Sequence, residues 1–91
     1  LMYRPVFTKQ FRKDIKLAVK QGRDIEQFKL IARSLISGKK LDPIFKDHQL
    51  VGNYIGRREC HIESDWLLIY KIENDMLIFE RAGSHSELFS K

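Results

Sequence analysis

The sequence predicts an α+β domain in which an N-terminal antiparallel helical hairpin packs on a small, mainly antiparallel β-sheet. Two stretches within the first 38 residues repeat apolar residues at helical spacing. Three later stretches are short, contain apolar runs, and are separated by turn-forming pairs. Links this short connect antiparallel strands, because parallel strands need long crossovers. We therefore expect the order β-α-α-β-β-β within a single domain of residues 1–91.

The first two elements are an edge strand and a helix. Residues 2–6 predict a short strand at the sheet edge, where Pro5 removes no ladder hydrogen bond. Thr8 is a suitable N-cap for a helix that runs to about Gln21, and Gly22 suits the position after its end. The residues that helical spacing places on the buried side of this helix are Phe11, Ile15, Ala18 and Val19.

A second helix is predicted from Asp24 to Gly38. Asp24 and Gln27 form a pattern like a capping box, and Gly38 ends the apolar repeat. The apolar residues at helical spacing are Phe28, Ile31, Ala32, Leu35 and Ile36. Because only one or two residues separate the helices, we expect them to pack as an antiparallel hairpin.

The remaining chain predicts a loop and three strands. Residues 39–55 lack clear periodicity, and we expect a loop there with one helical turn. The run 66–70 is apolar at every position, as expected for a middle strand covered by helices. The predicted strands are residues 57–62, 66–72 and 76–82, with turns at residues 63–64 and 74–75.

Composition and charge limit the class of function. Hydrophobic residues make up 43% of the chain, which indicates a folded domain. No apolar run approaches the roughly 18 residues of a membrane span. One cysteine cannot form an internal disulfide, which fits the reducing cytoplasm.

Positive charge is concentrated in the first part of the chain. The net charge of +5 divides into +8 for residues 1–40 (eleven Lys/Arg, three Asp/Glu) and −3 for residues 41–91 (six and nine). A basic surface of this kind favours nucleic acid as a partner, and a well-solvated helix surface is the alternative. The candidate RNA-binding residues on the first helix are Lys9, Arg12, Lys13, Lys16 and Lys20.

Hairpin geometry brings ionisable groups to one end of the predicted sheet. A turn centred at residues 63–64 places His61 opposite Trp66, and one centred at residues 74–75 places Asp65 opposite Ser84. His61, Asp65, Trp66 and His85 then lie at the same end of the sheet, on strands about 4.8 Å apart. The third histidine, His48, falls in the predicted loop, so strand pairing does not place it.

Such a group suits acid–base cleavage of RNA. RNA carries its own nucleophile, the 2′-hydroxyl, so the protein has to move two protons and stabilise charge on phosphorus. Histidine, with a pKa near 6.5, can accept and donate these protons. Arg81 is available to stabilise the charge on phosphorus, and Trp66 or Phe89 can stack on a base.

Each of these residues also has a plainer interpretation. A lone histidine at a strand end is commonly a surface residue, and Asp65 is a typical turn residue. Trp66 and Phe89 are typical core residues, and Cys60 behaves as a small buried hydrophobe.

The sequence resembles a known family over about its C-terminal half. Three blocks carry the resemblance: residues 47–52 (DHQLVG), 58–70 (RECHIESDWLLIY) and 81–89 (RAGSHSELF). In this order and spacing they resemble the YafQ branch of the RelE/ParE toxin superfamily. The resemblance implies a RelE-like fold and a role as toxin in a type II toxin–antitoxin system.

The resemblance also implies an activity, partners and site residues. Such toxins are cytoplasmic endoribonucleases that cut mRNA in the ribosomal A site without a metal or small-molecule cofactor. A cognate antitoxin protein neutralises them, and the basic first helix is expected to face ribosomal RNA. The implied catalytic residues are His48, His61, Asp65 and His85. Arg81 is the implied phosphate contact in substrate binding, and Trp66 and Phe89 are implied as supporting or substrate-contacting residues. We expect His85 to be the general acid, His48 or His61 the base, and Asp65 to orient a histidine.

The sequence is also compatible with two alternatives. A non-catalytic toxin resembling the gyrase-directed ParE branch would share the same fold, since a fold does not fix a function. A metal site is the other, because the histidines together with Asp65 make a plausible ligand set.

Overall fold

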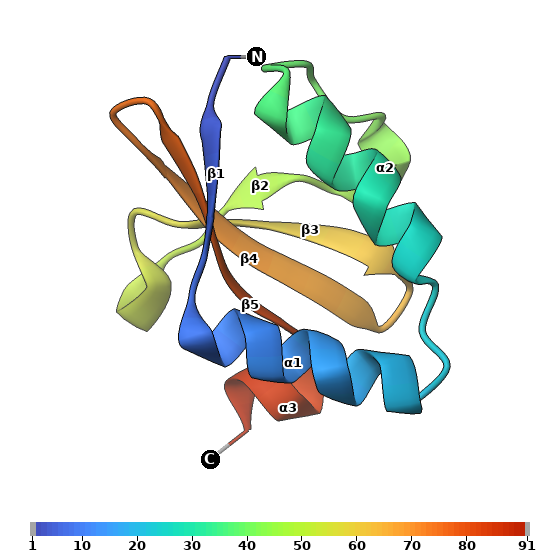
Figure 1. The fold of residues 1–91 in the computed structure, drawn as a ribbon. Helices are drawn as coiled ribbons and strands as arrows, with labels where there is room; N and C mark the ends of the chain where they lie inside the picture. Colours follow the sequence, from blue (N-terminus) through green and yellow to red (C-terminus); the bar gives the residue numbers. More distant parts are fainter. Residues whose placement is uncertain (1, 91) are drawn as a thin grey trace.

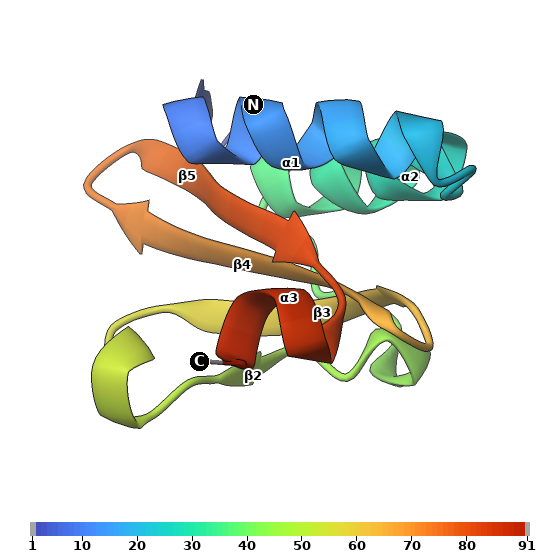
Figure 2. The same ribbon diagram turned by 90° about the horizontal axis from the view of Figure 1, so that it is seen from below.

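The computed structural model describes residues 2–90 and shows a five-stranded mixed sheet between two helical layers (Figures 1 and 2). The sheet order is β1-β5-β4-β3-β2, with β1 parallel to β5 and all other pairs antiparallel. The predicted α+β fold is confirmed. In chain order the elements are β1 (Arg4–Phe7), α1 (Lys9–Lys20), α2 (Ile25–Ile36), the 3-10 helix η1 (Pro43–Phe45), β2 (His48–Gln49), the 3-10 helix η2 (Gly52–Tyr54), β3 (Arg58–Glu63), β4 (Trp66–Glu73), β5 (Met76–Gly83) and α3 (His85–Phe89).

Helix α1 begins and ends where its capping residues predict. The Thr8 side chain accepts a hydrogen bond from the Phe11 N–H, and Gly22 has the positive φ of +74° that its position requires. The predicted buried side is only partly right. Val19 is 59% exposed, and Asp14 is buried in its place. Phe11, Asp14 and Ala18 follow the i, i+3, i+7 spacing of one helix side, and Val19 lies outside that side.

Helix α2 follows after a short turn and runs back across the sheet at an incline to α1 (Figure 1). Asp24 is its N-cap and accepts from the Gln27 N–H, as predicted. Four of the five predicted apolar residues are buried, and Ile36 is partly buried: Phe28, Ile31, Ala32, Leu35 and Ile36. Within residues 2–90, no helix has the length and apolar content to cross a membrane.

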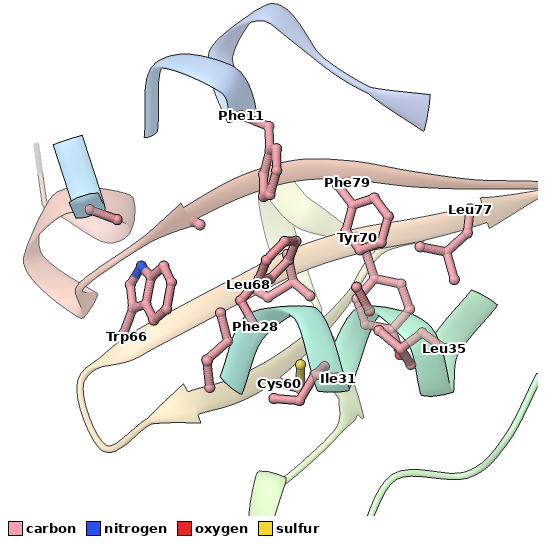
Figure 3. Packing of buried hydrophobic residues seen from close by; sticks show 14 residues of the cluster. Phe11, Phe28, Ile31, Leu35, Cys60, Trp66, Leu68, Tyr70, Leu77 and Phe79 are labelled. Carbon is pink, nitrogen blue, oxygen red and sulfur yellow. The ribbon is translucent and has the colours of Figure 1, made fainter. Parts of the chain in front are cut away.

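Strand β4 is buried on both of its faces. Trp66, Leu68 and Tyr70 belong to the main core cluster beneath α1 and α2 (Figure 3). Leu67 and Ile69 point to the opposite face and pack with Leu88 of α3, with Leu50 and Tyr54 partly buried beside them. This second cover explains why the run is apolar without alternation.

The turn between β3 and β4 differs from its prediction by one residue. It lies at Ser64 and Asp65, and His61 pairs with Leu67 instead of Trp66. The later turn alone would pair His61 with Leu68, and the register shift between His61 and Glu63 moves the pairing to Leu67, because a bulge adds a residue to one strand.

A second bulge shifts β5 against β4. Tyr70 pairs with Phe79, whereas Ile69 pairs with Arg81, so Glu80 is the extra residue. Beyond it, Leu67 pairs with Gly83, and the shift brings Asp65 beside His85 instead of Ser84.

The predicted loop at residues 39–55 contains a strand that the sequence did not reveal. Strand β2 is only His48 and Gln49, paired antiparallel with β3 at the edge of the sheet. Two residues are too few to show an alternating pattern. The pairing of His48 with Glu59 nevertheless places this histidine on the sheet.

Replacing Leu68 with alanine should destabilise the protein by about 2–5 kcal/mol, because it leaves a cavity in a fully buried site. Urea unfolding measures the change. Ile72→Ala on the same strand is the matched control, because Ile72 is 45% exposed. A similar loss for both variants would contradict the burial of Leu68 in the main core.

Candidate active site

Strand alternation places two histidines on the sheet face away from α1 and α2. Cys60 of β3 lies in the main core, so its neighbours Glu59 and His61 point to the opposite face. Glu59 pairs with His48 on β2 and with Ile69 on β4, whose side chain lies on that same face. We call this side of the sheet the histidine face.

Glu59 lies between two of the histidines. One of its carboxylate oxygens, Oε1, is 3.4 Å from His48 Nε2 and 3.8 Å from His61 Nε2. The Glu59 side chain is only 6% exposed. Sequence reasoning did not select Glu59 as a site residue. Its position two residues before His61 on a strand was the signal that could have found it, because such residues share a face.

The main chain holds His48 in one orientation. Its Nδ1 lies 2.6 Å from the Lys46 carbonyl oxygen, which can only accept a hydrogen bond. Nδ1 therefore carries the hydrogen, and Nε2 faces Glu59. Asp47 anchors the same segment, because it accepts a 2.8 Å hydrogen bond from the Tyr70 hydroxyl and a 3.3 Å one from Arg58 Nε.

Asp65 holds His85 at the first residue of α3. Its Oδ1 accepts hydrogen bonds from the His85 backbone N–H at 3.0 Å and from Nδ1 at 2.9 Å. The backbone N–H of His85, followed by its ring, keeps the pKa of Asp65 below its usual value. Since Nδ1 donates to Asp65, Nε2 of His85 is free to exchange a proton with a ligand. Ser84 caps the helix and fixes where His85 emerges.

The histidine face continues from His61 to an exposed aromatic ring. The rings of His61 and His85 are 5.8 Å apart, and Phe89 lies 6.4 Å beyond His85. Phe89 is 42% exposed and packs edge-on against Tyr54. The structure thus brings His61, Asp65 and His85 together, as the hairpin geometry predicted.

Trp66 does not belong to this group, and its prediction as a substrate contact is wrong. Its side chain is 1% exposed and lies in the core under α1 and α2 (Figure 3). Trp66 shares the face of Leu68, because side chains alternate along β4. The exposed aromatic side chain next to the histidines is Phe89.

Arg81 is bound to another part of the protein. Its Nε and Nη2 donate to the Asp14 carboxylate at 2.8 and 3.3 Å, and its side chain is 28% exposed. The hydrogen bond to Asp14 raises the pKa of Arg81, and the Tyr54 hydroxyl adds to this effect. A contact between Arg81 and a phosphate remains a prediction.

The five basic residues of α1 are exposed. Among residues 2–90 no ion pair engages any of them. The Arg12 guanidinium lies 5.7 Å from the centre of the Phe7 ring, and the others extend into solvent: Lys9, Lys13, Lys16 and Lys20.

No group of three or more histidine, cysteine or carboxylate side chains in residues 2–90 is arranged to hold a metal ion. A groove of about 380 Å³ borders the site, and its lining includes His61, Lys46 and Ser64.

Comparison with known proteins gives consistent matches along nearly the whole chain. A family model described as "Bacterial toxin of type II toxin-antitoxin system, YafQ" matches residues 3–90. A curated protein of Escherichia coli (strain K12) named "mRNA interferase toxin YafQ" is 42% identical over 84 residues, covering 91% of each chain.

Two solved structures are similar in fold and sequence. A chain of the E. coli DinJ–YafQ toxin–antitoxin complex has a TM-score of 0.90 and 39% identity, covering 98% of this chain and 99% of its own. A metal-bound toxin from Helicobacter pylori has a TM-score of 0.90 and 40% identity, covering 97% of this chain and 100% of its own.

The fold and these matches define a bacterial toxin of a type II toxin–antitoxin system. Within that class, the chain belongs to the YafQ family.

The bond between Asp65 and His85 should make stability depend on pH. The folded-state pKa of Asp65 lies below its ordinary value of about 3.9, so its contribution is fully present above about pH 3.9. It is lost as the pH falls through the lowered folded pKa. Thermal unfolding of wild type and Asp65→Asn measures this directly, because every other carboxylate titrates in both proteins. The wild type should be more stable at pH 7, and the difference should shrink towards pH 2. A constant difference across this range would contradict the assignment.

Proposed function

We propose that this YafQ-family toxin is a metal-independent endoribonuclease that cleaves mRNA in the A site of the ribosome. The observation that carries the proposal is the fixed His85, whose Nδ1 is bound to Asp65 and whose ring lies 5.8 Å from that of His61. Two imidazoles at this separation can serve the two sides of one phosphodiester. The name "mRNA interferase" of the E. coli relative supports the same activity.

The reaction needs a base on one side of the phosphate and an acid on the other. His48 or His61, in its unprotonated form, takes the proton of the 2′-hydroxyl through Nε2. The 2′-oxygen then bonds to phosphorus, and the bond from phosphorus to the 5′-oxygen breaks. Protonated His85 donates its Nε2 proton to that 5′-oxygen, with Asp65 stabilising the imidazolium before transfer. The products are a 2′,3′-cyclic phosphate, which water can open to a 3′-phosphate, and a free 5′-hydroxyl.

Other exposed groups suit substrate binding. Phe89, half-exposed beside His85, can stack on a base of the bound mRNA. Arg81 can offer N–H groups to the phosphate, since its side chain is partly exposed. The negative charge of Glu59 compensates the positive charge of a protonated His48 or His61. Because Oε1 lies near Nε2 of both rings, Glu59 can pair with either histidine.

The partners follow from the same proposal. The basic side of α1 faces ribosomal RNA, which carries one negative charge per nucleotide. A cognate antitoxin protein holds the toxin inactive, and the solved toxin–antitoxin complex of DinJ with the E. coli relative supports a partner of this kind. Translating ribosomes place the protein in the cytoplasm.

Replacing His85 with alanine should lower cleavage of ribosome-bound mRNA by at least about 100-fold, because the leaving oxygen loses its acid. The measurement is mapping of mRNA 5′ ends after addition of toxin to ribosome complexes, with and without ribosomes. Glu73→Gln, an exposed change at the far end of β4, is the matched control and should keep the wild-type rate. Circular dichroism reports whether the variants are folded.

A folded His85→Ala variant with the wild-type rate would contradict the catalytic assignment. Cleavage abolished by a chelator, with magnesium compensated to keep the ribosomes intact, would indicate a metal mechanism. DNA damage without discrete mRNA ends in cells would indicate a gyrase-directed toxin.

Replacing Lys9, Lys13 and Lys16 together with glutamine should weaken ribosome binding while leaving the cleavage rate at saturation nearly unchanged. Each lost phosphate contact should reduce the slope of log affinity against log salt by about 0.7–0.9. The measurement is half-saturation by ribosomes at several salt concentrations. The control replaces exposed Lys29, Arg33 and Lys39 with glutamine, which gives the same net charge of +2 (+5 − 3). Equal weakening of both triple variants would show that net charge, not the α1 side, determines binding.

A further inference from the structure

Asp14 is the only acidic residue of α1, a helix that otherwise carries basic charge. The basic side chains of the helix are exposed, whereas Asp14 is 9% exposed and points into the protein. A buried carboxylate in a basic helix is costly unless it is paired and hydrogen-bonded. Its contacts therefore indicate what the residue does.

The Asp14 carboxylate has three partners on two segments. It accepts from Gln10 Nε2 at 3.0 Å within its own helix and from the Ala82 backbone N–H at 3.0 Å. It also accepts the two hydrogen bonds from Arg81 at 2.8 and 3.3 Å. The pairing of β1 with β5 ends at Phe79, so β1 offers no acceptor to the Ala82 N–H. Asp14 supplies that acceptor.

The two bonds to Asp14 occupy one particular side of the Arg81 guanidinium. They use Nε and Nη2, which lie along one edge of the planar group. The end edge, formed by Nη1 and the second hydrogen of Nη2, is not used by Asp14, and the Tyr54 hydroxyl lies near the guanidinium. That edge can bind two oxygens of a phosphate in the paired geometry typical of arginine.

Arg81 belongs to the histidine face. It pairs across the sheet with Ile69, and Ile69 pairs with Glu59, so the three residues form one row across β5, β4 and β3. Tyr54 joins this row to the exposed end of the site, because it lies near Arg81 and packs against Phe89. Phe89 in turn lies beside His85.

We propose that Asp14 is a positioning residue that holds the Arg81 guanidinium at the edge of the histidine face, with its end donors directed to the phosphate being cleaved. This inference rests on the proposed cleavage of mRNA. An arginine held in place before the substrate arrives loses less side-chain entropy when it binds the phosphate. It also meets the charge that develops on phosphorus without first having to rearrange.

The test separates this role from simple support of the fold. Asp14→Asn keeps an oxygen that can accept from the Ala82 N–H, but it removes the charge and the second oxygen that fix Arg81. Four proteins are compared: wild type, Asp14→Asn, Arg81→Lys and the double variant. Asp75→Asn is the matched control, since it breaks a 3.1 Å ion pair with Arg4 that is exposed and far along the sheet. Single-turnover cleavage on saturating ribosome complexes gives the rate, and a titration with ribosomes gives half-saturation.

Asp14→Asn should lower the rate at saturation by about tenfold, because the phosphate contact is displaced and not removed. Half-saturation should change by less than about twofold, since ribosome binding depends on exposed charges elsewhere. The double variant should be within about twofold of Arg81→Lys, because Asp14 acts through Arg81. Asp75→Asn should keep the wild-type rate. Rates are corrected for the folded fraction of each variant, which removes a purely structural loss.

A wild-type rate for Asp14→Asn, or a tenfold loss that multiplies with that of Arg81→Lys, would overturn the inference. A wild-type rate for Arg81→Lys would overturn it as well, because Asp14 would have no group to act through. In each of these cases the wild type still cleaves, so the proposed function stands. Absence of cleavage by the wild type would instead refute the proposed function, and this inference with it.

Discussion

Burial of β4 on both faces is the constraint on which the rest of the molecule depends. Residues 66–70 are at most 1% exposed, so each face needs its own cover. Helices α1 and α2 cover one face, and α3 with the segment around Tyr54 covers the other. Leu88 can pack on Leu67 and Ile69 only if α3 turns back beneath the sheet, and that turn brings His85 beside Asp65. The packing of α3 therefore both covers the second face of β4 and brings His85 to Asp65.

Alternation along the strands then places side chains of the main core on one face of the sheet and the ionisable side chains of the site on the other. On β3, Cys60 and Ile62 enter the main core, while Glu59 and His61 face the other side. The three histidines consequently lie on regular elements and not in loops: His48 and His61 on strands, and His85 on α3. Each of His48 and His85 is also held through Nδ1, by a main-chain carbonyl in one case and a carboxylate in the other. These contacts fix the direction of Nε2 in both rings: Nε2 of His85 points away from Asp65, and Nε2 of His48 faces Glu59.

The sequence predicted the helices well because their signals are local. Thr8 and Asp24 mark the starts of the helices, and Gly22 and Gly38 follow their ends. The end of the sheet at which the polar residues gather was also predictable from hairpin lengths. The register was not, because the two bulges depend on packing between strands and leave no local pattern. A shift of one residue is enough to move a partner to the other face, which is why Trp66 was misplaced.

The remaining failures involve contacts between distant segments. His48 is placed by a two-residue strand, Glu59 by its position between two histidines, and Asp14 by Arg81, which is 67 residues away. A helical pattern shows that Asp14 interrupts the apolar side of α1, but it does not show which cation compensates the carboxylate. Once that cation is identified as Arg81, the helix that carries the exposed basic residues is tied directly to the strand that precedes His85. Helix α1 therefore presents its basic side chains to solvent on one side and binds Arg81 through Asp14 on the other.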